Sequence, residues 1–201
     1  MIVFIRTKDV ANGFNSKEYI MSKYFDEVVR GTKYWSDNPD TLFLGQSIAY
    51  VGNVLFNTLN DAKVPMSKRL EVPVFEEVQM GMSTGLALGG IIPISMFPRF
   101  DFLLCAMNQL VNHLDKLSDM SCQTICPKVI IKTLVGSIRP LHPGHQHCGD
   151  YTDGIRSMLK NVDVIKLEYA SEVFPAYRKA LERIDGKSTL IIEMSDLYKD
   201  E

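Results

Sequence analysis

The fold is decided by the stretch Pro73-Val-Phe-Glu-Glu-Val-Gln-Met-Gly-Met-Ser-Thr-Gly-Leu-Ala-Leu-Gly-Gly90, in which an apolar run leads through two glutamates into a longer apolar segment. We predict a strand over residues 70–75 and a helix over residues 77–89. The predicted helix has no polar face, so we expect it to be packed closely on several sides. Its glycines lower helix propensity, which indicates that a neighbouring segment packs closely against the helix and compensates for this cost.

Strands alternate with helices on both sides of this stretch. Short apolar runs bounded by turn residues predict further strands over residues 41–45, 91–96, 128–132, 162–166 and 188–193. Helices are expected over residues 16–30, 102–117 and 171–183. This order predicts an α/β fold with a mostly parallel sheet and helices on both faces. We expect one domain over residues 16–201, preceded by an N-terminal extension over residues 1–15.

Composition and charge exclude several classes of protein. The chain has 201 residues, of which 46% are hydrophobic and 23% charged, as is typical of a folded globular domain. A net charge of -2 offers no basic field for a phosphate backbone, so no nucleic-acid partner is expected. The sequence has no run of membrane-spanning length and no signal peptide, so we expect a cytoplasmic protein with no membrane partner. Its four cysteines are expected to be reduced thiols.

Three groups of residues are candidates for chemistry, and the first is the pair Glu76 and Glu77. A carboxylate between an apolar strand and an apolar helix lies near solvent, is paired with another polar group, or is held for a chemical role. Burial of the charge without a partner is costly. Negative charge also stabilises a helix N-terminus. From the residues alone, this structural role is the favoured interpretation of both glutamates.

The second group contains Phe97, Phe100 and Phe102, followed by the polar run Asn108-Gln-Leu-Val-Asn-His113. Aromatic residues beside a strand end belong to the core more often than to a cofactor platform. Taken alone, these aromatic residues therefore indicate part of the hydrophobic core and not a cofactor-binding site.

The third group is the loop Leu141-His-Pro-Gly-His-Gln-His-Cys148, which holds three of the four histidines. Histidine and cysteine bind zinc, so a site built on His142, His145, His147 and Cys148 is one interpretation. Their spacing fits no standard structural zinc site, and a histidine-rich active-site loop explains the cluster at least as well. We therefore expect no metal site in this chain.

Together and in this order, the three groups resemble the beta subunit of the decarboxylating component of 2-oxo acid dehydrogenases, such as pyruvate dehydrogenase. More broadly, they resemble the pyrimidine-binding domain of the transketolase-like superfamily. The resemblance covers residues 16–198 and is strongest over residues 73–116, from Glu76 through Gly90-Ile-Ile-Pro93 to His113. It implies the thiamine-diphosphate-binding pyrimidine-domain fold, here lacking the C-terminal domain that such beta subunits carry.

The resemblance assigns roles to four residues. Glu76 would activate thiamine diphosphate through a hydrogen bond to a nitrogen of its pyrimidine ring, and the cofactor would carry the difficult chemistry. Phe102 would stack on that ring, with Phe100 nearby. His145 would lie near the substrate and donate hydrogen bonds or protons. The implied catalytic residues are thus Glu76 and His145, and the implied cofactor-binding residues are Glu76, Phe100 and Phe102.

Departures from the family pattern bear on the partner and the substrate. Val78 stands where the family usually has glycine, and Gln146-His147 stand where it often has Ser-Gln. The family's Gly-Asp-Gly signature for Mg²⁺ and diphosphate does not occur in this sequence. The resemblance therefore implies that an alpha-type partner subunit holds Mg²⁺ and the diphosphate, in an alpha2-beta2 heterotetramer.

This resemblance is compatible with three functions. The favoured one is decarboxylation of a 2-oxo acid by a split, pyruvate dehydrogenase-like oxidoreductase, because Glu76, Phe102 and His145 are all retained. Another is a carboligase or transketolase-type half-enzyme acting on a ketose, for which the chain's end at Glu201 without a further domain leaves room. The third is a non-catalytic assembly subunit of the same fold.

Overall fold

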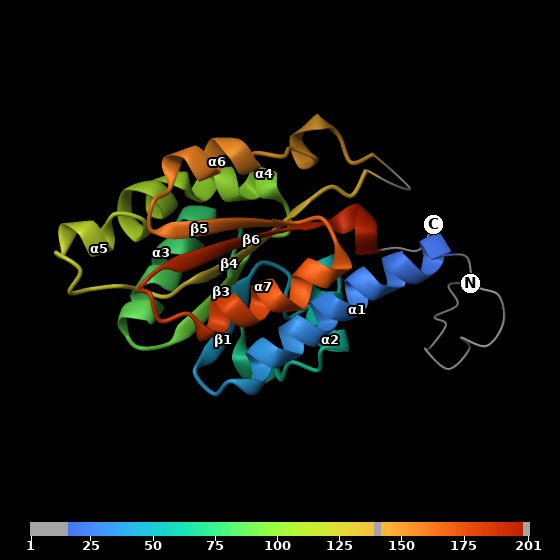
Figure 1. Cartoon of the computed structure of the whole chain (residues 1–201), viewed down its shortest axis with the longest axis horizontal. Coiled ribbons are helices and arrows are strands. Elements are labelled where there is room, and N and C mark those ends of the chain that lie inside the picture. Colours follow the sequence, from blue (N-terminus) through green and yellow to red (C-terminus); the bar gives the residue numbers. More distant parts are fainter. Residues whose placement is uncertain (1–15, 139–141, 199–201) are drawn as a thin grey trace.

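The computed structural model describes residues 16–138 and 142–198, which form a six-stranded sheet (Figure 1). All neighbouring strands are parallel, in the order β2-β1-β3-β4-β6-β5. The strands are β1 (Thr41–Gly45), β2 (Arg69–Glu71), β3 (Ile92–Met96), β4 (Ile130–Val135), β5 (Val162–Leu167) and β6 (Ser188–Met194). The predicted α/β fold is therefore confirmed, whereas the expected extension over residues 1–15 lies outside the described residues.

Helices cover both faces of the sheet, as predicted (Figure 1). One face carries α1 (Ser16–Asp37), α2 (Val54–Asp61) and α7 (Ala170–Glu182). The other carries α3 (Glu76–Leu88), α4 (Phe100–Leu103), the π-helical segment η3 (Asn108–Leu114) and α6 (Thr152–Met158). Shorter helical turns are η1 (Met66–Lys68), η2 (Leu104–Ala106), α5 (Leu117–Met120), η4 (His145–His147) and η5 (Ser195–Tyr198). In the described part of the chain, no helix is both long and apolar enough to cross a membrane.

Each face of the sheet has its own hydrophobic core, because successive side chains of a strand point to opposite faces. In β4, Ile130 packs in the core beneath α1 and α7, whereas Ile131 packs in the core beneath α3 and α4. Lys132 interrupts the apolar run of this strand. It is fully buried against Glu193 of β6, with 3.0 Å between Lys132 Nζ and Glu193 Oε1.

The connections of the sheet change direction between β1 and β3. From β1 the chain passes to β2 at one edge, and it then returns across β1 to β3. All later strands lie on the β3 side of β1. In open α/β sheets, ligands bind outside the carboxyl ends of the strands at such a switch point. The topology therefore places a site at the loops that follow β1 and β3.

Helix α1 ends at Asp37, whereas the sequence pattern predicted an end near residue 30. Trp35, which lies beyond the predicted end, is fully buried and stacks on Tyr177 of α7 with 3.8 Å between ring centroids. Gly31 permits this approach, because a Cβ there would come within 2.3 Å of the Tyr177 ring. Packing against α7 thus extends the helix beyond its local sequence signal.

Two other predicted helices differ from the structure. The single helix expected over residues 102–117 is wrong, because α4, η2 and η3 succeed one another there. Helix α3 lies where it was predicted, but it is not packed on several sides. Its residues Val78, Met82 and Leu88 are exposed, so one face of this apolar helix has no cover from the described chain.

Candidate active site

Glu76 lies at the switch point of the sheet. It is the first residue of α3 and is half-buried. Gln46, which directly follows β1, donates a hydrogen bond from Nε2 to Glu76 Oε1 at 3.0 Å. This bond places the Glu76 carboxylate at the carboxyl end of β1, although the two residues are 30 positions apart in the sequence.

A second carboxylate holds the loop that presents Gln46. Glu71, at the end of β2, accepts hydrogen bonds from three consecutive backbone N–H groups, those of residues 47–49, within 2.8 Å. Asn53 donates to the carbonyl oxygen of Gln46 at 3.2 Å and also caps α2. Neither Glu71 nor Gln46 was predicted from the sequence, because their partners lie 22 to 30 positions away and leave no local pattern.

The neighbouring carboxylate, Glu77, has a different environment. It accepts hydrogen bonds from Asn108 Nδ2 at 2.9 Å and from Gln109 Nε2 at 3.2 Å. The hydrogen bond from Asn108 lowers the pKa of the Glu77 carboxyl. Glu77 therefore joins α3 to η3 and has a structural role of the kind that the sequence allowed for either glutamate.

Gln79 ties α3 to the end of β3. This fully buried side chain donates from Nε2 to Ser95 Oγ at 3.2 Å and to the carbonyl oxygen of Met96 at 3.0 Å. Its Oε1 is buried and accepts no hydrogen bond from the described residues. Such an acceptor is rare in a folded protein, and a bound ligand or water at the switch point would explain it.

The two predicted cofactor-binding aromatics lie at the start of α4 and differ in exposure. Phe100 is fully buried, with its ring edge-to-face against Tyr151 at 5.5 Å between centroids. Phe102 is half-buried, and its ring meets that of His147 edge-to-face at 5.6 Å. Phe100 thus belongs to the core, and Phe102 retains surface for a ligand.

Arg99 holds residues 142–148, the histidine loop, against the start of α4. Its Nη1 donates to the carbonyl oxygens of Gly136 at 2.9 Å and His147 at 2.7 Å. Asp101 adds to this clamp by accepting hydrogen bonds from the Gly149 N–H at 3.2 Å and the Tyr151 hydroxyl at 3.0 Å. Arg99 was not predicted as a site residue, because the carbonyl groups it binds are 37 and 48 positions away and leave no local pattern.

His145 lies exposed in η4, within the clamped loop. Its ring centroid is 5.7 Å from that of His142. The structure therefore brings the loop of His145 beside Phe102, while no hydrogen bond or ion pair joins His145 to Glu76 among the described residues. No group of three or more His, Cys, Asp and Glu side chains in the described chain is arranged to hold a metal ion, so the zinc interpretation gains no support.

Replacing Arg99 with methionine should release the histidine loop, because two carbonyl oxygens lose their charged donor. We expect hydrogen exchange of the Gly149 amide, measured by NMR, to speed up at least about tenfold. The matched control is Arg156→Met, since the Arg156 guanidinium pairs on the surface with Asp153, which is 96% exposed. Unchanged exchange at Gly149 in the Arg99 variant would show that the clamp does not hold the loop.

Several solved structures share this fold. No protein-family model matches the chain, and no curated protein matches it in sequence. A transketolase from Leishmania mexicana gives a TM-score of 0.65 at 17% identity, covering 84% of this chain and 24% of that chain. The transketolase from Campylobacter jejuni subsp. jejuni NCTC 11168 gives 0.60 at 15%, covering 84% and 25%. A split gene transketolase, described as an inactive beta4 tetramer, gives 0.55 at 18%, covering 86% and 50%. The fold is transketolase-like.

The transketolase-like fold is the fold that the broader of the two resemblances implies. It does not single out a pyruvate dehydrogenase beta subunit, because these three structures are transketolases. This chain spans half or less of the length of each of them. The structural similarity therefore extends over only part of each of those transketolase chains.

Proposed function

We propose that this chain is the pyrimidine-binding half of a thiamine-diphosphate-dependent enzyme whose active site is completed by a partner subunit. The observation that carries the proposal is the Glu76 carboxylate, which Gln46 holds through one oxygen at the switch point of a transketolase-like sheet. Bound thiamine diphosphate would supply the electron sink for chemistry at a substrate carbonyl. The protein would supply orientation and proton transfer.

The described residues fit the pyrimidine end of this cofactor better than its diphosphate end. Glu76 offers a carboxylate oxygen that Gln46 leaves open, and Phe102 offers a partly exposed aromatic ring. A diphosphate is usually held through Mg²⁺ and its oxygen ligands, and the described acidic side chains do not gather in a group suited to a metal. The proposal therefore assigns Mg²⁺ and the diphosphate to an alpha-type partner in an alpha2-beta2 assembly.

Each proposed site residue has a task that its position permits. Glu76 would hold a proton and share it with a ring nitrogen of the aminopyrimidine, a role for which a positioned carboxyl group is suited. Phe102 would pack on the ring and exclude water, and buried Phe100 would fix the start of α4 behind it. His145, exposed on the clamped loop, would donate a hydrogen bond or proton to the substrate oxygen.

The proposed partner would cover an apolar surface next to Glu76. This surface is formed by Val74, Phe75, Val78 and Met82, which are 79%, 56%, 40% and 38% exposed. Exposed apolar side chains gathered in one place mark sites of association. Val78, which replaces the usual family glycine, is part of this surface and would contact the partner.

Two substrate classes are compatible with the same half-site. Decarboxylation of a 2-oxo acid follows from the sequence resemblance to pyruvate dehydrogenase beta subunits. Transfer from a ketose is favoured by the structural similarity to transketolases, one of them encoded by a split gene. Pyruvate with a lipoyl acceptor and a ketose with an aldose acceptor, each supplied to the reconstituted complex, distinguish the two.

Calorimetric titration of thiamine diphosphate with Mg²⁺ tests the shared site. We expect no tight binding to this chain alone, and saturable binding after it is mixed with an alpha-type subunit. Tight binding to the isolated chain would mean that the diphosphate site lies here and the proposal of a split site is wrong. No binding to the mixture would instead favour a non-catalytic assembly subunit.

A further inference from the structure

Strand β5 is the last strand of the sheet and pairs only with β6 among the described strands. Backbone groups of successive residues in a strand point alternately to its two sides. The Asn161 carbonyl faces β6, where it accepts a hydrogen bond from the Ser188 N–H. The N–H and C=O groups of Val162, Val164 and Lys166 consequently point to the open edge, which is a template for pairing with another chain.

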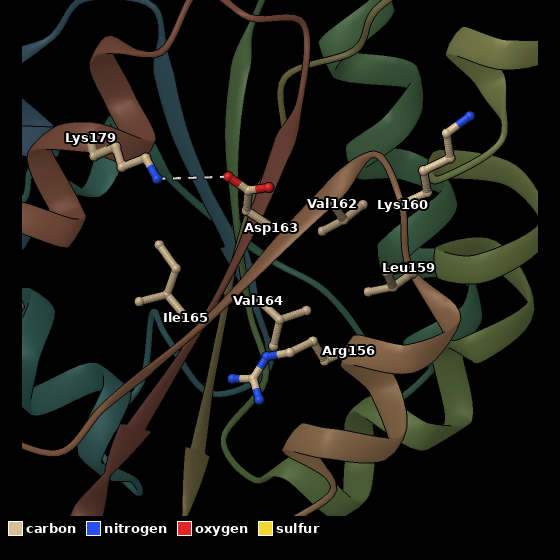
Figure 2. Close-up of a pocket in the computed structure, with 8 residues that line it drawn as sticks. All are labelled: Arg156, Leu159, Lys160, Val162, Asp163, Val164, Ile165 and Lys179. Atoms are coloured by element: carbon tan, nitrogen blue, oxygen red, sulfur yellow. Dashed lines mark ion pairs between the residues drawn. The ribbon is translucent and has the colours of Figure 1, made fainter.

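A groove of about 340 Å³ runs along this open edge (Figure 2). Val162, Val164 and Ile165 give it an apolar floor. Arg156 and Lys160 stand on one side of β5, and Lys179 of α7 stands on the other, as Figure 2 shows. The edge thus combines backbone N–H and C=O groups that face no described strand with positively charged side chains on both sides, the cationic walls of the groove.

The charge of the groove differs in sign from that of the whole chain. Its lining includes three cations, Arg156, Lys160 and Lys179, whose side chains are 50%, 72% and 63% exposed. The single carboxylate in the lining, Asp163, pairs with Arg183 at 2.8 Å and more loosely with Lys179 at 3.8 Å (Figure 2), so the lining keeps a net positive charge. Arg156 and Lys160 form ion pairs only at the surface. Such exposed ion pairs contribute little to stability, so both cations can change partners. The complete chain, in contrast, has a net charge of -2.

We propose that the open edge of β5 binds an extended, acidic segment of a partner protein, which adds a seventh strand to the sheet. Its backbone would pair with the outward groups of Val162, Val164 and Lys166, and its carboxylates would meet the cationic walls. A second copy of this chain fits less well, because pairing β5 with β5 would bring the same cations together. The edge is separated from β1 and Glu76 by β3, β4 and β6, so this surface does not depend on the proposed activity.

The test uses a fluorescent ten-residue peptide in which glutamate alternates with valine and threonine. We expect saturable binding that weakens at least about tenfold as salt rises and the charge attraction is screened. A peptide methylated on alternate backbone nitrogens should bind at least about tenfold more weakly, because it cannot complete the strand ladder. In hydrogen exchange, the amides of Val164 and Lys166 should become protected by the peptide, while that of Ile165 should be slow with and without it.

A charge reversal with a matched control completes the test. Lys160→Glu should weaken peptide binding at least about tenfold, whereas Lys33→Glu should not change it. Lys33 is a fair control because it lies on α1, is 57% exposed and pairs with Asp37. The proposal is overturned by absence of saturable binding, by equal binding of the methylated peptide, or by equal effects of the two variants. Without peptide, protection of the Val164 amide from hydrogen exchange could rise with protein concentration. This result would show that a second copy occupies the edge, and it would also overturn the proposal.

Discussion

Replacing Glu76 with glutamine should lower kcat of the reconstituted complex at least about 100-fold at saturating thiamine diphosphate and Mg²⁺, because a positioned acid contributes this much to proton transfer. The glutamine oxygen can still accept the hydrogen bond that Gln46 donates to Glu76 Oε1. The substitution therefore removes the exchangeable proton and keeps the local structure. Steady-state turnover of the complex, with thermal unfolding followed in parallel, measures the effect.

The control for this prediction is the adjacent residue. Glu77→Gln changes the same functional group, but Glu77 is bonded to Asn108 and Gln109 of η3 instead of facing Gln46. We expect this variant to retain turnover within a few-fold of the original chain. If both variants lose activity alike, the loss reflects disruption of α3. If neither loses activity, Glu76 is not the activating acid and the assembly-subunit function gains support.

The fold was predictable because its signals are local. Strand β1 lies over residues 41–45, as predicted, since an apolar run that ends at a glycine needs no distant partner to be recognised. Helices α2 and α6 were not predicted, because they have only eight and seven residues and a weak periodic signal. The breaks between residues 100 and 114 depend on contacts with α3 and the sheet, which the local pattern does not contain.

The candidate site was predictable only in part. Glu76, Phe102 and His145 were named from residue types that resemble a family, whereas the side chains that position them were missed. Gln46 and Arg99 act through hydrogen bonds that span 30 to 48 positions of the sequence. A single sequence carries no signal for such pairs, because any glutamine or arginine near a strand end would look the same.

A buried network offers the largest expected effect on stability. Lys132 and Glu193 have no exposed side-chain surface and form an ion pair at 3.0 Å. Lys132 Nζ also donates to the Tyr177 hydroxyl at 3.1 Å, and the hydroxyls of Tyr177 and Tyr198 both donate to Glu193. Burial lowers the pKa of Lys132, an effect that Glu193 opposes. Burial and Glu193 raise the pKa of both tyrosines well above the usual value, so the hydroxyls remain donors at neutral pH.

Replacing Lys132 with methionine should lower the free energy of unfolding by about 3–5 kcal/mol, because it leaves the Glu193 charge buried without its cation. Urea denaturation measures this loss. The control is Lys33→Met on the surface of α1. Lys33 pairs with Asp37, their side chains are 57% and 62% exposed, and the loss of this ion pair should cost less than about 1 kcal/mol. A Lys132 variant no less stable than the Lys33 variant would contradict the assigned role of the pair.

A double-mutant cycle separates the ion pair from simple packing. Combining Lys132→Met with Glu193→Gln removes both charges; the glutamine oxygen can accept from one tyrosine hydroxyl, and its amide NH2 can donate to the other. We therefore expect the double variant to lose less stability than the sum of the single variants, by at least about 2 kcal/mol. Additive losses would mean that each side chain acts through its own packing. Because Lys132 faces the core beneath α7 and the proposed cofactor side lies across the sheet, the double variant should also keep its affinity for thiamine diphosphate in the mixed complex.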